Sequence, residues 1–130
     1  MNKDDGRVVS NFINQCIDNK PITIYGDGTQ TRSLCYIDDL LEGLMKLMNN
    51  KITHGPINLG NPFELTILEI AEKIKLISNS NSTIQFMPLP SDDPMKRKPD
   101  ITKASNILKW EPNINVDEGL KKTYDYFKNI

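Results

Sequence analysis

Hydrophobic residues recur every three or four positions in several stretches of this chain, the spacing that gives a helix one apolar face. The clearest such helix is expected from residue 67 to about 78, after Thr66 and Glu69, which fit a capping box. Its apolar stripe consists of Ile67, Ile70, Ala71, Ile74 and Ile77. The same spacing predicts four more helices, over residues 8–19, 39–48, 102–108 and 116–127. Asp38 and Thr102 are the expected caps of the second and third of these.

Four short runs have the composition of strands: residues 22–25, 33–36, 56–60 and 83–87. The first two flank the turn Gly26-Asp27-Gly28, so we predict that they pair as a hairpin. Residues 88–99 are charged and bounded by prolines, which predicts a loop and the first place to expect function. The mixed order predicts an α/β fold with an incomplete sheet of short strands and about five helices, as if cut from a longer chain.

The length and the charge of the chain exclude several classes of protein. The 130 residues suit one compact unit, so residues 1–130 are treated as a single domain. Sixteen Lys and Arg against 17 Asp and Glu give a net charge of -1, which argues against a nucleic-acid partner. No stretch approaches the ~20 apolar residues that cross a bilayer, and residues 1–6 do not resemble a signal peptide. We therefore expect a soluble, cytoplasmic chain with no membrane segment.

The residue types that usually bind metals are scarce. Cys16 and Cys35 lack metal-ligand spacing and His54 is the single histidine, so no metal site is expected. Both cysteines have apolar neighbours in the sequence and are interpreted as buried, reduced packing residues.

Arginine is also scarce, and this makes each arginine informative. Only Arg7, Arg32 and Arg97 occur, whereas lysine is plentiful. The planar guanidinium binds phosphate or carboxylate in a bidentate manner and the lysine ammonium does not. The three arginines are therefore candidates for specific anion contacts, with ordinary surface salt bridges as the alternative.

Four runs of sequence have the order and spacing of a known family. They are residues 6–12 (Gly-Arg-Val-Val-Ser-Asn-Phe), 25–33 (Tyr-Gly-Asp-Gly-Thr-Gln-Thr-Arg-Ser), 58–62 (Asn-Leu-Gly-Asn-Pro) and 92–101 (Asp-Asp-Pro-Met-Lys-Arg-Lys-Pro-Asp-Ile). Together they closely resemble the UDP-glucuronate decarboxylases, or UDP-xylose synthases, of the extended short-chain dehydrogenase/reductase family. The glycine turn with Gln-x-Arg is shared with nucleotide-sugar epimerases and 4,6-dehydratases. Residues 7–12 and 96–100 favour the decarboxylases, as does Ser33, where the dehydratases usually carry aspartate.

The resemblance implies an enzyme with an N-terminal Rossmann domain that binds NAD and a C-terminal part that binds the UDP-sugar, to which this chain corresponds. Such an enzyme oxidises UDP-glucuronate at C4 with NAD, releases carbon dioxide and reduces the ketone to UDP-xylose. In the implied UDP site, Arg32 and Arg97 contact the diphosphate, and Asp100 contacts the ribose or the loop that holds it. The other implied contacts are Arg7 on the phosphate side, Tyr25 at the uracil pocket, Val8 and Val9 lining that pocket, and Gln30 in the shared motif. The residues alone leave another role open for Asp100, as a cap of the following helix.

The family's dinucleotide-binding motif does not occur in this sequence, and its catalytic Tyr-x-x-x-Lys pair is expected outside it. A glycine-rich dinucleotide fingerprint is absent, and Gly26-x-Gly28 lacks its third glycine. Tyr124 and Lys128 match the catalytic Tyr-x-x-x-Lys spacing but lie in the last predicted helix, where Tyr124 and Phe127 are interpreted as core residues. We therefore expect no catalytic residue here, no bound NAD and no activity of the chain alone.

Two other functions stay open: another nucleotide-sugar epimerase or 4,6-dehydratase, and a non-catalytic nucleotide-sugar-binding or interaction module. The longer enzyme is expected to be a homodimer, and a Golgi protein if an anchor precedes the chain. The helix at 39–48 and the strand at 57–59 should meet the Rossmann domain. Their apolar surface is therefore expected to cause self-association of the chain alone.

Overall fold

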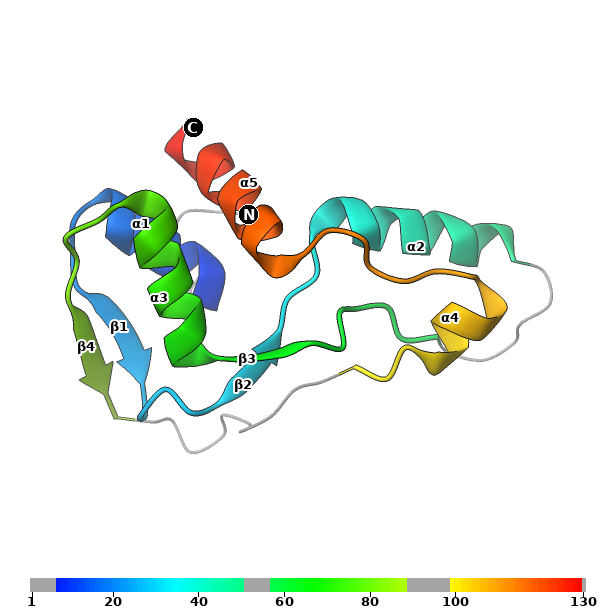
Figure 1. Ribbon diagram of the computed structural model, residues 1–130, viewed down its shortest axis with the longest axis horizontal. Helices are drawn as coiled ribbons and strands as arrows, with labels where there is room; N and C mark the ends of the chain where they lie inside the picture. Colours follow the sequence, from blue (N-terminus) through cyan, green and yellow to red (C-terminus); the bar gives the residue numbers. More distant parts are fainter. Residues whose placement is uncertain (1–6, 51–56, 89–98, 130) are drawn as a thin grey trace.

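The computed structural model describes residues 7–50, 57–88 and 99–129, which form an elongated α/β molecule (Figure 1). Its elements, in chain order, are α1 (Val8–Ile17), β1 (Ile22–Tyr25), β2 (Thr31–Ser33), α2 (Ile37–Asn49), β3 (Glu64–Thr66), α3 (Ile67–Ser78), β4 (Ile84–Met87), α4 (Thr102–Ile107) and α5 (Val116–Lys128). This mixture of five helices and short strands in the described residues confirms the predicted fold class.

The strands pair differently from the prediction. Strand β1 runs parallel to β4, with Ile22 opposite Ile84, whereas β2 runs antiparallel to β3, with Arg32 opposite Leu65. The predicted hairpin between residues 22–25 and 33–36 is therefore wrong. Gly26 and Gly28 both have φ of 82°, and the chain passes through them to a different partner strand.

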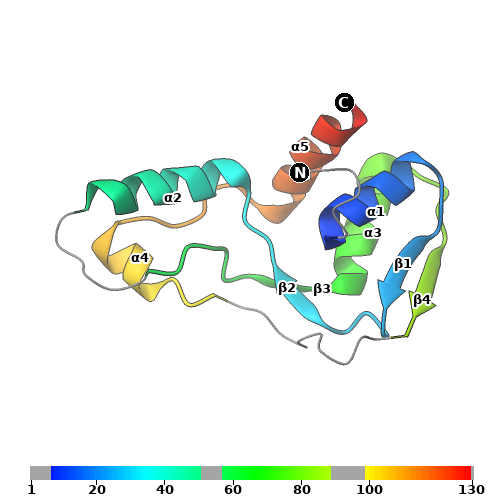
Figure 2. The ribbon, with the colours of Figure 1, turned by 180° about the vertical axis from the view of Figure 1, so that it is seen from behind.

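Two hydrophobic clusters hold the molecule together. The larger one joins α1, α3 and α5 to β1 through Phe12, Ile13, Cys16, Ile22, Ile24, Leu65, Ile67, Ile70, Ala71, Ile74, Leu120 and Phe127. The smaller one consists of Ala104, Leu108 and Trp110, with Cys35, Leu47, Ile57, Leu59 and Ile101 packed against it. Figure 2 shows α2 and α4 at one end of the molecule and β1 and β4 at the other, with β2 and β3 between them.

A buried carboxylate fixes α2 in the smaller half. The Asp39 side chain, 3% exposed, accepts hydrogen bonds at Oδ2 from the backbone amides of Asn113 (3.0 Å) and Ile114 (2.8 Å). The Trp110 indole Nε1 donates to the Asp39 carbonyl at 2.8 Å. One turn later, a Cβ added to Gly43 would lie 3.0 Å from the indole ring. These contacts attach the inner face of α2 to the segment between α4 and α5.

The helix ends confirm some expected caps and correct others. The capping box is confirmed: Thr66 Oγ1 accepts from the Glu69 amide (3.1 Å) and Glu69 Oε1 accepts from the Thr66 amide (3.0 Å). Asp38 is not a cap, because α2 already begins at Ile37 after Tyr36. Thr102 is the first residue of α4 rather than its cap.

Other expectations can be compared with the described residues. Residues 57–60 form no strand, and the start of that predicted strand lies outside the described residues. Cys16 is buried, as predicted, and Cys35 is half-buried, where burial raises the pKa of its thiol. Phe127 is buried and Tyr124 packs against the larger cluster, which confirms both as core residues. In the described part of the chain, no helix has the length and apolar character needed to span a membrane.

Asp39→Ala should lower the free energy of unfolding by about 2–4 kcal/mol, because it removes the shared acceptor of the Asn113 and Ile114 amides, whose hydrogen bonds are partly buried. Asp38→Ala is the matched control, since Asp38 is the exposed neighbouring carboxylate in the same helical turn, and it should cost less than about 1 kcal/mol. Urea denaturation followed by far-UV circular dichroism measures both. Equal losses in the two variants would contradict this role of Asp39.

Candidate functional site

Three of the predicted UDP contacts lie on the segment from the end of β1 to β2. The Tyr25 ring is 48% exposed, whereas Gln30 is 2% exposed and its Nε2 donates to the Tyr25 carbonyl at 2.7 Å. Arg32 is half-buried in β2, and its Nη1 donates to the Thr31 carbonyl at 2.7 Å. Gln30 therefore closes the turn behind Tyr25 instead of presenting its amide nitrogen to a ligand.

The turn between these residues rests on the start of α3. The backbone carbonyls of Gln30 and Gly28 accept from the amides of Ile67 (2.8 Å) and Leu68 (3.1 Å). A Cβ added to Gly28 would lie 3.0 Å from the Leu68 Cβ. Glycine here allows close packing against a helix, whereas the fingerprint glycines of dinucleotide-binding folds allow a pyrophosphate to approach. The turn therefore does not fit an NAD site.

The other N-terminal candidates lie at the start of α1. Arg7 is exposed, and its backbone carbonyl accepts from the Asn11 amide at 2.9 Å and from Ser10 Oγ at 3.2 Å. Val8 and Val9 are half-buried and pack against the larger hydrophobic cluster. Their side chains therefore have a packing role in addition to the predicted role at the uracil pocket.

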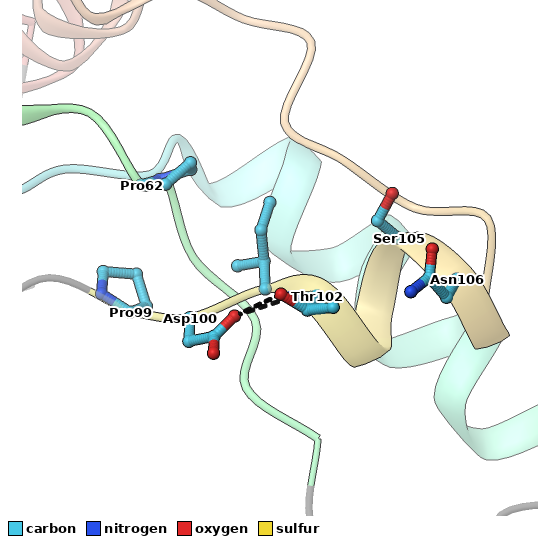
Figure 3. A pocket seen from close by; sticks show the side chains of 7 residues that line it. Pro62, Pro99, Asp100, Thr102, Ser105 and Asn106 are labelled. Carbon is cyan, nitrogen blue, oxygen red and sulfur yellow. Dashed lines mark hydrogen bonds between the residues drawn. The ribbon is translucent and has the colours of Figure 1, made fainter.

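Asp100 lies in the smaller half, at an open cavity of about 530 Å³ (Figure 3). The cavity is lined by Pro62, Pro99, Asp100, Ile101, Thr102, Ser105 and Asn106. Asp100 Oδ1 accepts from the Thr102 amide (3.0 Å) and from Thr102 Oγ1 (2.6 Å), and these bonds lower the pKa of the carboxyl. Asp100 is therefore not the cap residue of α4, which is Ile101, but its side chain accepts from the first backbone amide of that helix. In Figure 3 its second oxygen points away from Thr102.

Two residues that the sequence analysis quoted without a role connect this cavity to the rest of the molecule. Gly60 lies against Pro99, since a Cβ added to Gly60 would come within 2.8 Å of the Pro99 Cγ. Asn61 Nδ2 donates to the Leu34 carbonyl at 3.0 Å, and Asn61 Oδ1 accepts from the Phe63 amide at 3.1 Å. Leu34 lies two residues beyond Arg32, so Asn61 connects the segment of Arg32 to that of Asp100. In the sequence, the family-like run at residues 58–62 was the signal that could have pointed to Gly60 and Asn61.

Arg97 lies outside the described residues, so its predicted convergence with Arg32 stays a prediction. The structure brings Tyr25 and Gln30 into direct contact and places Arg32 two residues further along. Asp100 is instead hydrogen-bonded within its own segment.

Comparison with known proteins finds one matching family model and several similar proteins. Residues 1–60 match the NAD dependent epimerase/dehydratase family. The chain is 55% identical to UDP-glucuronic acid decarboxylase 1 of Arabidopsis thaliana, over 97% of this chain and 29% of that protein. It is 53% identical to UDP-glucuronic acid decarboxylase 1 of Danio rerio, over 98% of this chain and 30% of the relative. The chain therefore spans less than a third of the length of these two relatives.

A solved structure has the same fold. UDP-glucuronic acid 4-epimerase from Bacillus cereus, determined with UDP-glucuronic acid and NAD, superimposes with a TM-score of 0.89 at 35% identity. The match covers 95% of this chain and 40% of the epimerase chain. This likeness shows that the elements of our chain are arranged as in the corresponding part of that epimerase.

Thr102→Val should raise the pKa of Asp100 toward its ordinary value, because it removes the hydroxyl donor to the carboxylate. Since the pKa of Asp100 is lowered in the folded chain, the stabilisation exists above the unfolded pKa and is lost as the pH falls through the folded pKa. NMR titration of the Asp100 carboxyl measures the change. Ser105→Ala, at the same cavity, is the control and should leave that pKa unchanged. An unaltered Asp100 pKa in Thr102→Val would contradict the assignment.

Proposed function

We propose that this chain, a homologue of the UDP-glucuronic acid decarboxylases over nearly its whole length, is the UDP-sugar-binding part of such an enzyme. The complete enzyme would convert UDP-glucuronate to UDP-xylose and carbon dioxide. The observation that carries the proposal is the higher identity to two decarboxylases than to an epimerase of the same fold. That difference favours the decarboxylase over the epimerase as the parent reaction.

In this proposal NAD belongs to the part of the relatives that this chain does not span. When bound there, NAD would supply the oxidation and reduction at the sugar. The glycine turn of our chain is occupied by packing against Leu68, which supports this division. The residues described here would then bind and orient the UDP-sugar and would carry out no chemical step themselves.

Arg32 has the properties expected of a residue that binds a diphosphate. Its side chain is half-buried, and the hydrogen bond to the Thr31 carbonyl restricts the guanidinium before any ligand binds. A restricted guanidinium loses less conformational entropy when it forms paired hydrogen bonds to phosphate oxygens. The exposed Tyr25 ring, seven residues earlier and supported by Gln30, would form a wall for the uracil.

Asp100 would accept hydrogen bonds from the ribose. An aspartate is already ionised near neutral pH, and the bonds from Thr102 lower its pKa further, so the side chain acts as an acceptor only. One carboxylate oxygen accepts hydrogen bonds from Thr102, and the other would accept hydrogen bonds from the ribose hydroxyls. Helix support and ligand binding are therefore compatible roles for this residue.

The purified chain alone should not convert UDP-glucuronate to UDP-xylose, even with added NAD, and should not bind NAD tightly. The reason is that it lacks both a dinucleotide-binding loop and a catalytic Tyr/Lys pair next to one. Chromatography of the nucleotide-sugar products after long incubation tests the first point and calorimetric titration with NAD tests the second. Formation of UDP-xylose by the chain alone would contradict the proposal.

In the full-length enzyme, Arg32→Lys or Arg97→Lys should weaken UDP-sugar binding by ~1.5–3 kcal/mol, because lysine keeps the charge but loses the bidentate geometry. NAD affinity should stay the same. Lys121→Arg, a Lys/Arg exchange on the exposed surface of α5, is the control and should change neither affinity. Calorimetric titration with UDP measures the effect, and unchanged UDP affinity in both lysine variants would show that the roles are misassigned.

A further inference from the structure

Three segments that are distant in the sequence meet beside the candidate site. The first follows β2, the second covers residues 58–62, and the third is the segment that carries Asp100. One partly buried apolar residue from each packs against the smaller hydrophobic cluster: Cys35, Leu59 and Ile101. The position of Arg32 relative to Asp100 therefore depends on how these three segments are held together.

Asn61 forms a directional contact between the first two segments. Its Nδ2 donates to the Leu34 carbonyl at 3.0 Å, while its Oδ1 accepts from the Phe63 amide at 3.1 Å, which orients the side-chain amide. Apolar packing has no preferred direction, whereas a hydrogen bond weakens steeply when its geometry changes. Asn61 therefore fixes where the second segment lies relative to Leu34, two residues beyond Arg32.

Gly60 extends this arrangement to the third segment. A Cβ added to Gly60 would lie 2.8 Å from the Pro99 Cγ, so the two residues are closely packed. Pro99 immediately precedes Asp100, and both line the cavity of the candidate site (Figure 3). The contacts of Asn61 and Gly60 thus form a short path through the chain from Arg32 to Asp100.

We propose that Asn61 is a positioning residue, which sets the distance between the diphosphate contact at Arg32 and the ribose contact at Asp100. This inference rests on the proposed function, in which one UDP molecule contacts both residues. Because ribose and diphosphate are covalently joined, both contacts form together only when the two side chains are held at the matching distance. Asn61 thereby determines the preference for a ribonucleotide, although it is not itself one of the predicted UDP contacts.

Two variants break this path at different contacts. Asn61→Asp keeps the size of the side chain and the acceptor for the Phe63 amide, but it replaces the donor to the Leu34 carbonyl with a carboxylate oxygen. Gly60→Ala keeps the Asn61 hydrogen bond and displaces Pro99 instead. The φ of Gly60 is not positive, so alanine fits the backbone there and the Pro99 contact is what changes.

Calorimetric titration of the 130-residue chain with UDP and with 2′,3′-dideoxy-UDP tests the inference. The unaltered chain should bind UDP at least about tenfold more tightly, because the dideoxy analogue lacks the ribose hydroxyls that donate to the Asp100 carboxylate. In Asn61→Asp and in Gly60→Ala, this ratio should fall below about threefold through a loss of UDP affinity. Asn58→Asp is the matched control: it makes the same change at an exposed residue of the same segment, and it should keep the full ratio.

The ratio of the two affinities separates positioning from a merely structural role. A variant that only destabilised the fold would weaken the binding of both ligands alike and leave the ratio unchanged. Far-UV circular dichroism verifies that each variant is folded. A full preference for UDP in both Asn61→Asp and Gly60→Ala would overturn the inference and leave the proposed function standing. Equal affinity of the unaltered chain for the two ligands would contradict the proposed ribose contact itself, and the inference with it.

Discussion

The burial of the Asp39 carboxylate is the constraint on which the smaller half of the molecule depends. The hydrophobic cluster there has only three buried residues in the described part of the chain. Burial of so few apolar side chains is not enough to hold α2, α4 and the connector after α4 in place. The hydrogen bonds from Asn113 and Ile114 to Asp39, and from the Trp110 indole to the same residue's carbonyl, supply the missing specificity. Because a buried carboxylate is costly unless its acceptors are satisfied, α2 has one stable position.

That position determines where the candidate site can form. The α2 helix packs on the connector after α4, so the start of α4, with Asp100 and Thr102, is fixed through Trp110. Close contact between Gly60 and Pro99, together with the Asn61 bond to Leu34, connects this end to the strand that carries Arg32. The larger cluster fixes the other side, because the turn before Arg32 rests on α3. A UDP-sugar bound as proposed would thus contact both halves of the chain.

Local patterns were sufficient to predict the helices, and long-range contacts explain what the sequence could not reveal. The stripe from Ile67 to Ile77 and the Thr66–Glu69 box specify α3 through neighbours three and four residues apart. Strand pairing could not be predicted in this way. Strand β1 pairs with β4, about sixty residues later in the chain, and the Gly26–Gly28 turn does not indicate so distant a partner. In the sequence, Asp39 has the position of an ordinary acidic residue in the first turn of a helix. Its hydrogen bond from the Asn113 amide forms only in the folded chain. The resemblance supplied Tyr25, Gln30 and Arg32 as candidates, whereas the roles of Gly60 and Asn61 required the structure.

In the proposed function, this chain binds the UDP part of a nucleotide-sugar through residues from both halves. Titration of the ¹⁵N-labelled chain with UDP, followed by amide chemical shifts, tests this most directly. We expect the largest shifts at residues 25–33 and 99–106, with UMP giving smaller changes near Arg32. Shifts confined to the outer surfaces of α3 and α5, or no shift at millimolar UDP, would contradict it.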